Sequence, residues 1–334
     1  MTLSHRRKFW KARPVLVTGG AGFLGSWLSK TLVELGAGVV CLIRDQEPNS
    51  YLNFTGAGRK VTIVLGELED YFLLERVFNE YQIDTCFHLG AQPIVTAADR
   101  FPLATFESNI RGTWNVLEAA RKMPHLKCLA VASSDKAYGI SEKLPYREDD
   151  ALKGIHVYDV SKTCADLLTQ SYIHSYRLPA VISRCGNFYG PGDLNFDRLI
   201  PGTIRSLTLN ESPIIRSDGK YLRDYIYIED VVGAYLALAE NIDRVKGDAF
   251  NFGTATPTSV IDVVEELISI SGKSHLKPCI LNTAKNEIYA QYVAIDKAKK
   301  ALSWHPKFTL REGLKATYGW YRDFLKRPQR VKAV

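Results

Sequence analysis

A tyrosine and a lysine stand four residues apart in Tyr158-Asp-Val-Ser-Lys162. Residues at this spacing share one face of a helix. A phenol with its ordinary pKa of about 10 is a poor base at neutral pH, and an ammonium held beside it favours the phenolate. The pair could therefore take a proton from a hydroxyl, although Tyr-x-x-x-Lys by itself is more often a solvated helix face.

A second pair of ionisable residues lies in Ser133-Ser-Asp-Lys-Ala-Tyr-Gly139, directly after an apolar run. Asp135 and Lys136 could act as an acid–base pair. The alternative is a loop ion pair or a solvated turn. Their place at the end of a predicted buried strand favours chemistry, because ligands bind at that edge of open α/β sheets.

A glycine-rich run, Thr18-Gly-Gly-Ala-Gly-Phe-Leu-Gly25, follows the first predicted strand and opens a helix. Its glycines allow a tight turn and close approach to a pyrophosphate, which the helix N-terminus then faces. Asp45 lies 20 residues beyond Gly25, where an acid could hold the adenosine ribose of NAD. Arg44 could instead meet the 2′-phosphate of NADP, and the sequence favours NAD.

The elements that would position these residues alternate between β-branched runs and helix-period segments. This alternation predicts a Rossmann-type α/β fold, a doubly wound parallel sheet covered by helices on both faces. Strands are expected at 15–18, 39–43, 61–65, 85–89, 128–132 and 180–184, and helices at 23–35, 103–121 and 158–175.

After residue 186 the pattern becomes loop-rich. We expect a dinucleotide-binding domain over 1–186 and a smaller C-terminal α/β substrate-binding lobe over 187–325, with the chain crossing between them. Helices are expected at 198–209, 230–241, 260–271 and 310–325, with strands near 214 and 225–228.

The net charge of +7 comes from the two ends of the chain. Residues 1–13 carry five Lys/Arg and residues 326–334 carry four, which leaves 34 basic against 36 acidic side chains between them. We therefore expect two solvated basic tails, and no nucleic-acid partner. Six scattered cysteines without a C-x-x-C pair, and no apolar run of membrane length, favour a reducing cytoplasm and no membrane partner.

With its glycine-rich run and Tyr-x-x-x-Lys pair, the chain resembles the extended short-chain dehydrogenase/reductase family of NAD(P)-dependent epimerases and dehydratases acting on nucleotide sugars. The resemblance covers about residues 13–325. Supporting stretches are Gly66-Glu67-Leu68, His88-Leu-Gly-Ala-Gln92, Asn109-Ile-Arg-Gly-Thr113, Arg184-Cys-Gly-Asn-Phe-Tyr-Gly-Pro191, Arg223-Asp-Tyr and Ser303-Trp-His-Pro306. Glu67 departs from the family pattern, which usually has aspartate near the adenine.

The resemblance implies that Ser134 hydrogen-bonds a substrate hydroxyl and that the next two residues decide the reaction. Sugar-nucleotide 4,6-dehydratases place an acid–base pair there, Asp-Glu in those for dTDP-glucose and Asp-Lys in those for CDP-glucose. Asp135-Lys136 matches the second form. The implied reaction oxidises carbon 4, loses water across carbons 5 and 6, and returns the hydride to carbon 6.

The same resemblance implies two binding sets. The expected NAD contacts are Gly19, Gly22, Phe23, Leu24, Gly25, Arg44, Asp45, Glu67, Leu68, Gly90, Ala91, Gln92, Asn109, Tyr158 and Lys162. The expected contacts to a nucleotide-diphosphate sugar are Asn187, Arg198, Arg216 and Arg223, since guanidinium groups suit a diphosphate. Arg223 could instead form a structural salt bridge with Asp224 or Asp230.

Alternative interpretations remain open. A 4-epimerase or decarboxylase of the same family would use Tyr158 and Lys162 without losing water, and a redox-sensing dinucleotide binder would not turn over at all. His88 is expected to be a buried imidazole with its hydrogen bonds satisfied, Cys185 to line the pocket near the nicotinamide rather than act as a nucleophile, and Tyr225 and Tyr227 to pack in a strand. No cluster has metal-ligand spacing. Family members commonly form homodimers through long helices that correspond to 103–121 and 158–175.

Overall fold

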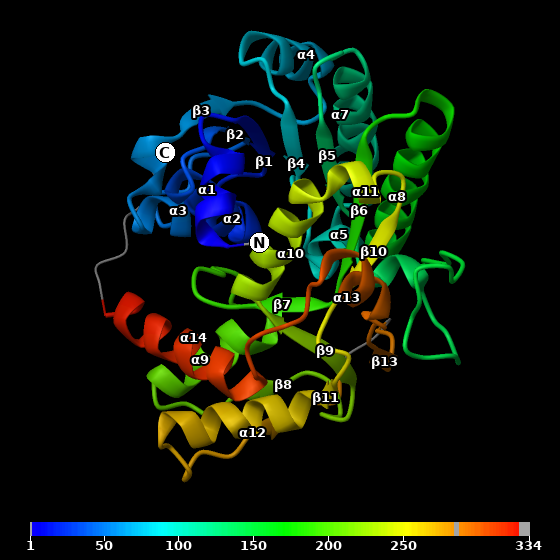
Figure 1. Cartoon of the computed structure of the whole chain (residues 1–334). Coiled ribbons are helices and arrows are strands. Elements are labelled where there is room, and N and C mark those ends of the chain that lie inside the picture. The colour runs from blue at the N-terminus through cyan, green and yellow to red at the C-terminus, as the bar shows by residue number, and fades with distance from the viewer. Residues whose placement is uncertain (1, 284–286, 327–334) are drawn as a thin grey trace.

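Seven parallel strands form the centre of the protein, shown in the computed structural model of Figure 1, which describes residues 2–283 and 287–326. The strands of this sheet are β1 Pro14–Thr18, β2 Gly38–Ile43, β3 Thr62–Leu65, β4 Thr85–His88, β5 Cys128–Ala132, β6 Ala180–Cys185 and β10 Ala249–Phe252. Their spatial order is β10-β6-β5-β4-β1-β2-β3, and every pairing is parallel. The predicted Rossmann-type sheet is confirmed.

Helices cover both faces of this sheet. The helices are α1 Leu3–Trp10, α2 Phe23–Glu34, α3 Tyr51–Phe54, α4 Tyr71–Glu80, α5 Val95–Arg100, α6 Pro102–Phe106, α7 Gly112–Arg121, α8 Val157–Tyr176, α9 Leu199–Thr208, α10 Ile228–Glu240, α11 Ile242–Val245, α12 Val260–Ser271, α13 Asp296–Leu302 and α14 Leu310–Phe324. Short turns are 3₁₀ segments η1 Ala57–Lys60 and η3 Asp135–Tyr138 and the π-helical segment η2 Glu107–Arg111.

Apart from the edge strand β3, which is largely exposed, the strands read as continuous apolar runs because both faces of the sheet are buried. Alternate residues of β1 belong to hydrophobic clusters on opposite faces of the sheet. Val15 and Val17 pack in the cluster with α2 and α10, whereas Leu16 packs in the cluster with α4 and α7. All three side chains are fully buried. The carboxyl ends of the parallel strands consequently meet at one edge of the sheet, where the predicted site residues lie.

A smaller lobe stands beyond that edge, below the sheet in Figure 1. Its strands are β7 Asn187–Tyr189, β8 Ile214–Ile215, β9 Leu222–Tyr227, β11 Pro257–Ser259, β12 Cys279–Ile280 and β13 Ala290–Gln291. β9 is central, pairing with β7, β11 and β13, while β8 pairs with β12. Helices α9, α12 and α14 pack together in this lobe.

The chain returns from the lobe to the sheet, as the sequence pattern indicates. Helix α10 packs against α2 and β5. Strand β10 then pairs with β6 and forms one edge of the large sheet. The division into domains at residue 186 stays a prediction, and β10, which follows this boundary, belongs to the large sheet.

The prediction of a solvated tail at 1–13 holds for the exposed side chains of Arg7, Lys8 and Lys11 but not for the segment as a whole. Residues 3–10 form α1, and Trp10 is fully buried with its ring against Phe87. The Trp10 indole donates to Glu240 at 2.9 Å, and Arg13 pairs with Asp84 at 3.2 Å. Packing of one large aromatic ring outweighs the charge of its neighbours, because burying such a ring removes much apolar surface from water. Of the basic tail predicted at 326–334, all but Lys326 lies outside the described residues.

The helix predicted over 103–121 is present, but it contains a π-helical turn. The segment is divided into α6, the π-helical turn η2 and α7. The turn carries Asn109, whose side chain takes part in three hydrogen bonds with Gln92 and Ser161. These tertiary bonds compensate for the irregular helix geometry, which periodicity cannot register. In the described residues, no helix is long and apolar enough to span a membrane.

Candidate active site

The glycine-rich turn after β1 is built by close backbone approach. Gly19 has φ +68°, and a Cβ on it would lie 2.8 Å from Gly90 Cα. A Cβ on Gly25 would lie 2.1 Å from the Gly19 carbonyl oxygen. Neither position can therefore carry a side chain without moving backbone. The turn leads into α2, whose cap residue Gly22 supplies no side-chain acceptor and whose first turn contains no acid.

This cradle fits a dinucleotide cofactor. The first N–H groups of α2, at Phe23, Leu24 and Gly25, lack an intrahelical acceptor by geometry and suit a pyrophosphate. Asp45 follows β2, the neighbour of β1, and its carboxylate accepts from Arg44 Nε at 2.8 Å. Both side chains are about two-thirds exposed. Arg44 is thus already paired with the acid that would hold a ribose.

The remaining predicted cofactor residues surround the same edge. Glu67 is exposed, and Leu68 is buried against Gly112. Gly90 donates its backbone N–H to the Thr18 hydroxyl at 3.0 Å. Ala91 and Gln92 follow it. The Asn109 side chain forms hydrogen bonds within the protein. It accepts from Gln92 N at 2.6 Å and donates to Ser161 Oγ at 2.9 Å, which connects the loop after β4 to α8.

The loop after β5 carries the predicted reaction-specific residues. Ser134 caps η3, accepting from the Lys136 backbone N–H at 3.2 Å and donating to Asp135 Oδ1 at 3.1 Å. Asp135 is only 2% exposed, and its second oxygen, Oδ2, has no partner among the described residues. This loop is neither a solvated turn nor, in the described structure, an Asp135–Lys136 ion pair within 4.0 Å.

Helix α8 brings the tyrosine and lysine to the same place. Tyr158 and Lys162 are both buried, and Lys162 Nζ donates to the carbonyl of Ala132, the last residue of β5, at 2.9 Å. Burial lowers the pKa of Lys162 to about 8. Burial raises the pKa of Tyr158, while the charge of Arg198 and the hydroxyl of Ser134 lower it. The charges of Asp135 and Asp159 act in the opposite direction and raise this pKa.

Lys136 lies in a group of mixed charges. Burial lowers the pKa of its ammonium, Asp135 and Asp159 raise it, and Arg223 lowers it. Asp159 is 3% exposed in the first turn of α8, and burial raises the pKa of its carboxyl, opposed by the charge of Lys136. Lys136 Nζ itself donates to Gln291 Oε1 at 2.8 Å. The charges of three carboxyl groups, those of Asp135, Asp159 and Glu287, and of Arg223 thus act on an ammonium that is bonded to a neutral amide.

The substrate lobe supplies three of the predicted arginines. Arg223, on β9, donates to the carbonyls of Leu222 and Tyr289 and pairs with Glu287 at 3.3 Å. Its predicted alternative partners, Asp224 and Asp230, are used elsewhere. Asp224 accepts from Thr254 and Ala255, and Asp230 accepts from the backbone of Lys307 and Phe308.

Arg198 precedes α9 and pairs with Asp193 at 2.9 Å. Its charge lowers the pKa of Tyr158 on α8. Arg216 is exposed and donates to the Asp197 carbonyl at 2.7 Å. Asn187 begins β7, directly after the sheet, and pairs in register with Tyr225 of β9.

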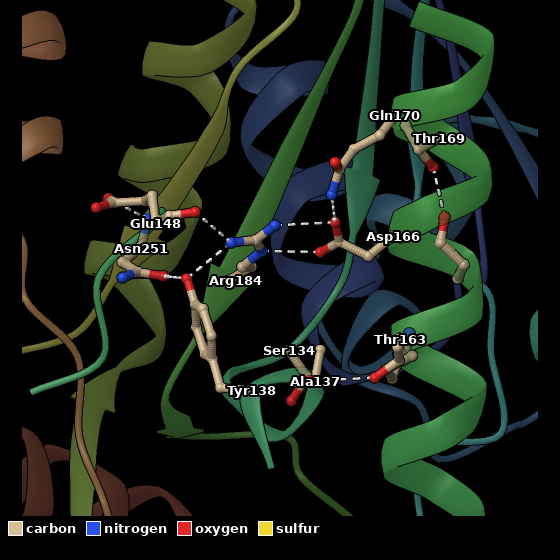
Figure 2. A network of polar contacts seen from close by, with 12 residues as sticks. Ser134, Ala137, Tyr138, Glu148, Thr163, Asp166, Thr169, Gln170, Arg184 and Asn251 are labelled. Carbon is tan, nitrogen blue, oxygen red and sulfur yellow. Dashed lines mark hydrogen bonds and ion pairs between the residues drawn. The ribbon is translucent and has the colours of Figure 1, made fainter. Parts of the chain in front are cut away.

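A buried polar network holds the loop and α8 together (Figure 2). Arg184 on β6 forms a bidentate pair with Asp166 on α8 and donates to the Tyr138 hydroxyl at 2.9 Å. Tyr138 in turn donates to Asn251 on β10 at 2.7 Å. Thr163 on α8 donates to the Ala137 carbonyl at 3.1 Å. The loop that carries Asp135 and Lys136 is therefore anchored to three neighbouring elements.

Two residues near Lys136, Asp159 and Gln291, were not predicted from the sequence. Asp159 lies inside the Tyr158–Lys162 motif, so an acid next to the tyrosine was the available signal. Gln291 has no such signal, since it lies 155 residues from Lys136 in sequence.

The residues for which no catalytic role is predicted, His88, Cys185, Tyr225 and Tyr227, are all buried. His88 bonds Thr18 at 2.9 Å and Thr113 at 3.1 Å, and burial lowers its pKa to about 3. Cys185 is buried beside Ser183, and burial raises the pKa of its thiol to about 12. Tyr225 and Tyr227 are buried in β9. In the described parts of the chain, no group of three His, Cys, Asp or Glu side chains could hold a metal ion.

Comparison with known proteins agrees with this geometry. The model of the NAD dependent epimerase/dehydratase family matches residues 15–253. The CDP-glucose 4,6-dehydratase of Salmonella typhimurium is 29% identical, over 96% of this chain and 93% of its own length.

Solved structures with the same fold include enzymes of two activities. A UDP-glucose 4-epimerase from Thermotoga maritima, solved with UDP-glucose, has a TM-score of 0.86 and 29% identity, covering 93% of this chain and 99% of its own. A dTDP-glucose 4,6-dehydratase from Bacillus anthracis, solved with NAD, has a TM-score of 0.83 and 26% identity, covering 93% and 97%. The relatives therefore divide between dehydratases and epimerases.

Proposed function

Since this chain belongs to the NAD-dependent epimerase/dehydratase family, we propose that it is a nucleotide-sugar 4,6-dehydratase that converts CDP-glucose to CDP-4-keto-6-deoxyglucose and water. The reaction oxidises carbon 4, eliminates water across carbons 5 and 6, and reduces carbon 6. The observation that carries the proposal is the state of Asp135 and Lys136, which an epimerase reaction does not need.

Asp135 and Lys136 lie at the sheet edge, and neither side chain is neutralised by an ion pair between them in the described structure. Asp135 Oδ2 has no partner in the described structure, and Lys136 is bonded to an amide rather than a carboxylate. A surface ion pair would instead be solvated and paired. The similarity to the Salmonella typhimurium CDP-glucose 4,6-dehydratase supports the same interpretation.

NAD is the proposed cofactor, held by the turn at Gly19–Gly25 and by Asp45. When bound, it supplies the reversible two-electron oxidation and reduction that the net reaction requires. The Arg44–Asp45 ion pair supports NAD over NADP, because Arg44 is engaged and no basic residue lies between Asp45 and Arg59.

Tyr158 is the proposed base for the carbon 4 hydroxyl. Burial opposes its phenolate, so neighbouring positive charge has to favour that form. Arg198 supplies such a charge, and Lys162, fixed to the Ala132 carbonyl, is the ammonium on the same helix face. Ser134 orients the substrate hydroxyl.

Asp135 and Lys136 then act on carbons 6 and 5. Oxidation at carbon 4 acidifies the proton on carbon 5, and Lys136, as the neutral amine, removes it. Its lowered pKa supports this role, since a larger fraction of the amine is unprotonated near neutral pH than for an ordinary lysine. Asp135, as the acid, protonates the departing carbon 6 hydroxyl, which leaves as water.

The diphosphate of the substrate is proposed to bind Asn187, Arg198, Arg216 and Arg223. A phosphate would compete with Glu287, which is nearly half exposed, for the forked guanidinium of Arg223. We also propose a homodimer through α7 and α8, supported by the exposed Trp114 and Leu167 on these adjacent helices. A reducing cytoplasm stays the expected compartment, supported by six free thiols.

The test is mass spectrometry of the purified protein with NAD and CDP-, dTDP-, GDP- or UDP-glucose. Loss of one water from CDP-glucose alone is the expected result. Water lost from another nucleotide would keep the mechanism and correct the base. Isomers without loss of water from any substrate would replace the proposal by the 4-epimerase reaction, which the similarity to the Thermotoga maritima enzyme makes the second candidate.

A further inference from the structure

Lys136 is held by a residue of the other lobe. Its Nζ donates to Gln291 Oε1 at 2.8 Å, and Gln291 is fully buried while Lys136 is only partly so. A lysine ammonium is a donor only, so the amide oxygen must face it and the amide nitrogen must point elsewhere. Accordingly, Gln291 Nε2 has no hydrogen-bond partner among the described residues.

The backbone around Gln291 leaves it little freedom. Gln291 lies on β13 and pairs in register with Arg223 of β9. Two residues later, Val293 forms a bridge with Tyr146, whose backbone N–H donates to the Tyr292 carbonyl at 3.0 Å and whose carbonyl accepts from Ala294 at 2.8 Å.

Tyr146 connects this strand back to the loop of Lys136. Its ring stacks on Tyr138 at a centroid distance of 4.8 Å, and its hydroxyl donates to the Gly139 carbonyl. The two partners of the Lys136–Gln291 bond are therefore placed by one continuous set of contacts between the lobes.

The neutrality of Gln291 matters for the state of Lys136. Asp135, Asp159 and Glu287 are near enough to raise the pKa of Lys136, and Arg223 is near enough to lower it. None of the three carboxylates forms an ion pair with Lys136 within 4.0 Å in the described structure.

The geometry points to Gln291 as a positioning residue, which holds the Lys136 amine in place for proton removal through a neutral hydrogen bond. This inference rests on the proposed dehydration. Through Gln291, the lobe proposed to bind the nucleotide also sets the geometry of the loop proposed to perform the elimination.

Two substitutions at one position separate positioning from mere packing. Gln291→Met keeps the volume and removes the acceptor, whereas Gln291→Glu keeps the shape and supplies a negative charge. Competitive labelling with acetic anhydride across pH, followed by peptide mass spectrometry, reports the pKa of Lys136 in each protein. Lys143, exposed in the same region of the chain, is the internal control.

The labelling pKa of Lys136 should shift in opposite directions. Gln291→Glu favours the ammonium and raises it, and Gln291→Met removes a bond to the ammonium and lowers it further. A purely structural role predicts no such opposition. An unchanged labelling pKa in both variants would overturn the inference, and thermal melting shows whether either variant is unfolded.

Dehydration is measured with CDP-glucose in a double-mutant cycle with Lys136→Met. Gln291→Met should slow water loss roughly 10- to 100-fold, the range for a hydrogen bond to a charged group, while the first oxidation changes less. In the Lys136→Met background it should add no further loss, because the contact is already absent. Equal losses in both backgrounds would contradict the inference. If the wild type dehydrates no sugar nucleotide, the proposed function is wrong, and the labelling result alone decides whether Gln291 sets the state of Lys136.

Discussion

The guanidinium of Arg184 and the carboxylate of Asp166 form two parallel hydrogen bonds, Nε to Oδ2 at 2.8 Å and Nη2 to Oδ1 at 3.0 Å (Figure 2). Both side chains are almost completely buried. Asp166 lies one turn of α8 beyond Lys162, and Arg184 also holds Tyr138 of the catalytic loop. The pair therefore fixes α8 relative to the loop after β5.

Breaking this pair should destabilise the whole fold. In Asp166→Asn the Arg184 charge stays buried without its counter-ion, so the free energy of unfolding should fall by about 3–5 kcal/mol. Urea denaturation measures the loss. Glu118→Gln is the control, since the Glu118–Arg121 pair is about one-third exposed and should contribute less than about 1 kcal/mol. Equal effects of the two substitutions would show that burial of the pair is irrelevant.

Asp135→Asn should separate the two chemical steps. The amide cannot protonate the departing hydroxyl, so water loss should slow by about 10²–10⁴. The first oxidation, which depends on Tyr158, should slow much less. Single-turnover absorbance of the reduced cofactor reports the first step, and mass spectrometry of the sugar reports the second. If both steps survive unchanged, Asp135 is not the acid.

Asp45→Ala should change the cofactor preference. The substitution removes the carboxylate proposed to hold the ribose and releases Arg44 from its ion pair. NAD affinity should fall by roughly 10-fold, the value of one hydrogen bond to a charged group, and NADP affinity should rise. Isothermal titration calorimetry with both cofactors gives the ratio. Arg44→Ala is the control and should leave NAD binding nearly unchanged; an NAD/NADP ratio equal in Asp45→Ala and the wild type would refute the assignment of Asp45.

His88 should make the protein less stable in mild acid. Its pKa is lowered to about 3 in the fold, so only the unfolded chain, with an ordinary value near 6.5, binds the proton as pH falls. The contribution is complete above about pH 6.5 and is lost progressively below it. Between pH 7 and 5 the wild type should lose about 2 kcal/mol more than His88→Gln in urea unfolding. Parallel pH profiles of the two proteins would mean that His88 titrates normally.

Leu167→Glu should abolish the proposed dimer. Leu167 is 51% exposed on α8, beside α7 with its exposed Trp114, and a charge at this position would be buried in an apolar interface. Light scattering after size exclusion gives the mass. Leu209→Glu is the matched control, because Leu209 is 56% exposed but ends α9 in the other lobe. A monomeric wild type, or a dimer that survives Leu167→Glu, would exclude this interface.

Much of the Rossmann half was predictable because its signals are local. Apolar runs define buried strands, and a run such as Cys128–Ala132 has the observed bounds. Gly19 and Gly25 indicate close backbone approach before any fold is known, and the carboxyl ends of parallel strands necessarily meet at one edge. Tyr158, Lys162, Ser134 and Asp135 could therefore be placed near one another from sequence alone.

Where the sequence failed, a distant contact outweighed a local preference. The periodicity of 103–121 is helical throughout, yet the bonds of Asn109 to Gln92 and Ser161 accompany a π-helical turn. The basic composition of residues 1–13 suggests solvation, yet Trp10 is buried and Glu240 receives its indole N–H.

The sequence by itself determined the sheet, the cofactor turn and the residue types available for acid–base chemistry, since strand burial and tight turns depend on neighbouring residues. Only the tertiary structure decided how those residues are charged and held. Gln291 meets Lys136, and Asp166 meets Arg184, across chain separations that no motif spans. Burial and neighbouring charge set the protonation of Lys136 and Tyr158, and both depend on atoms brought together by the complete fold.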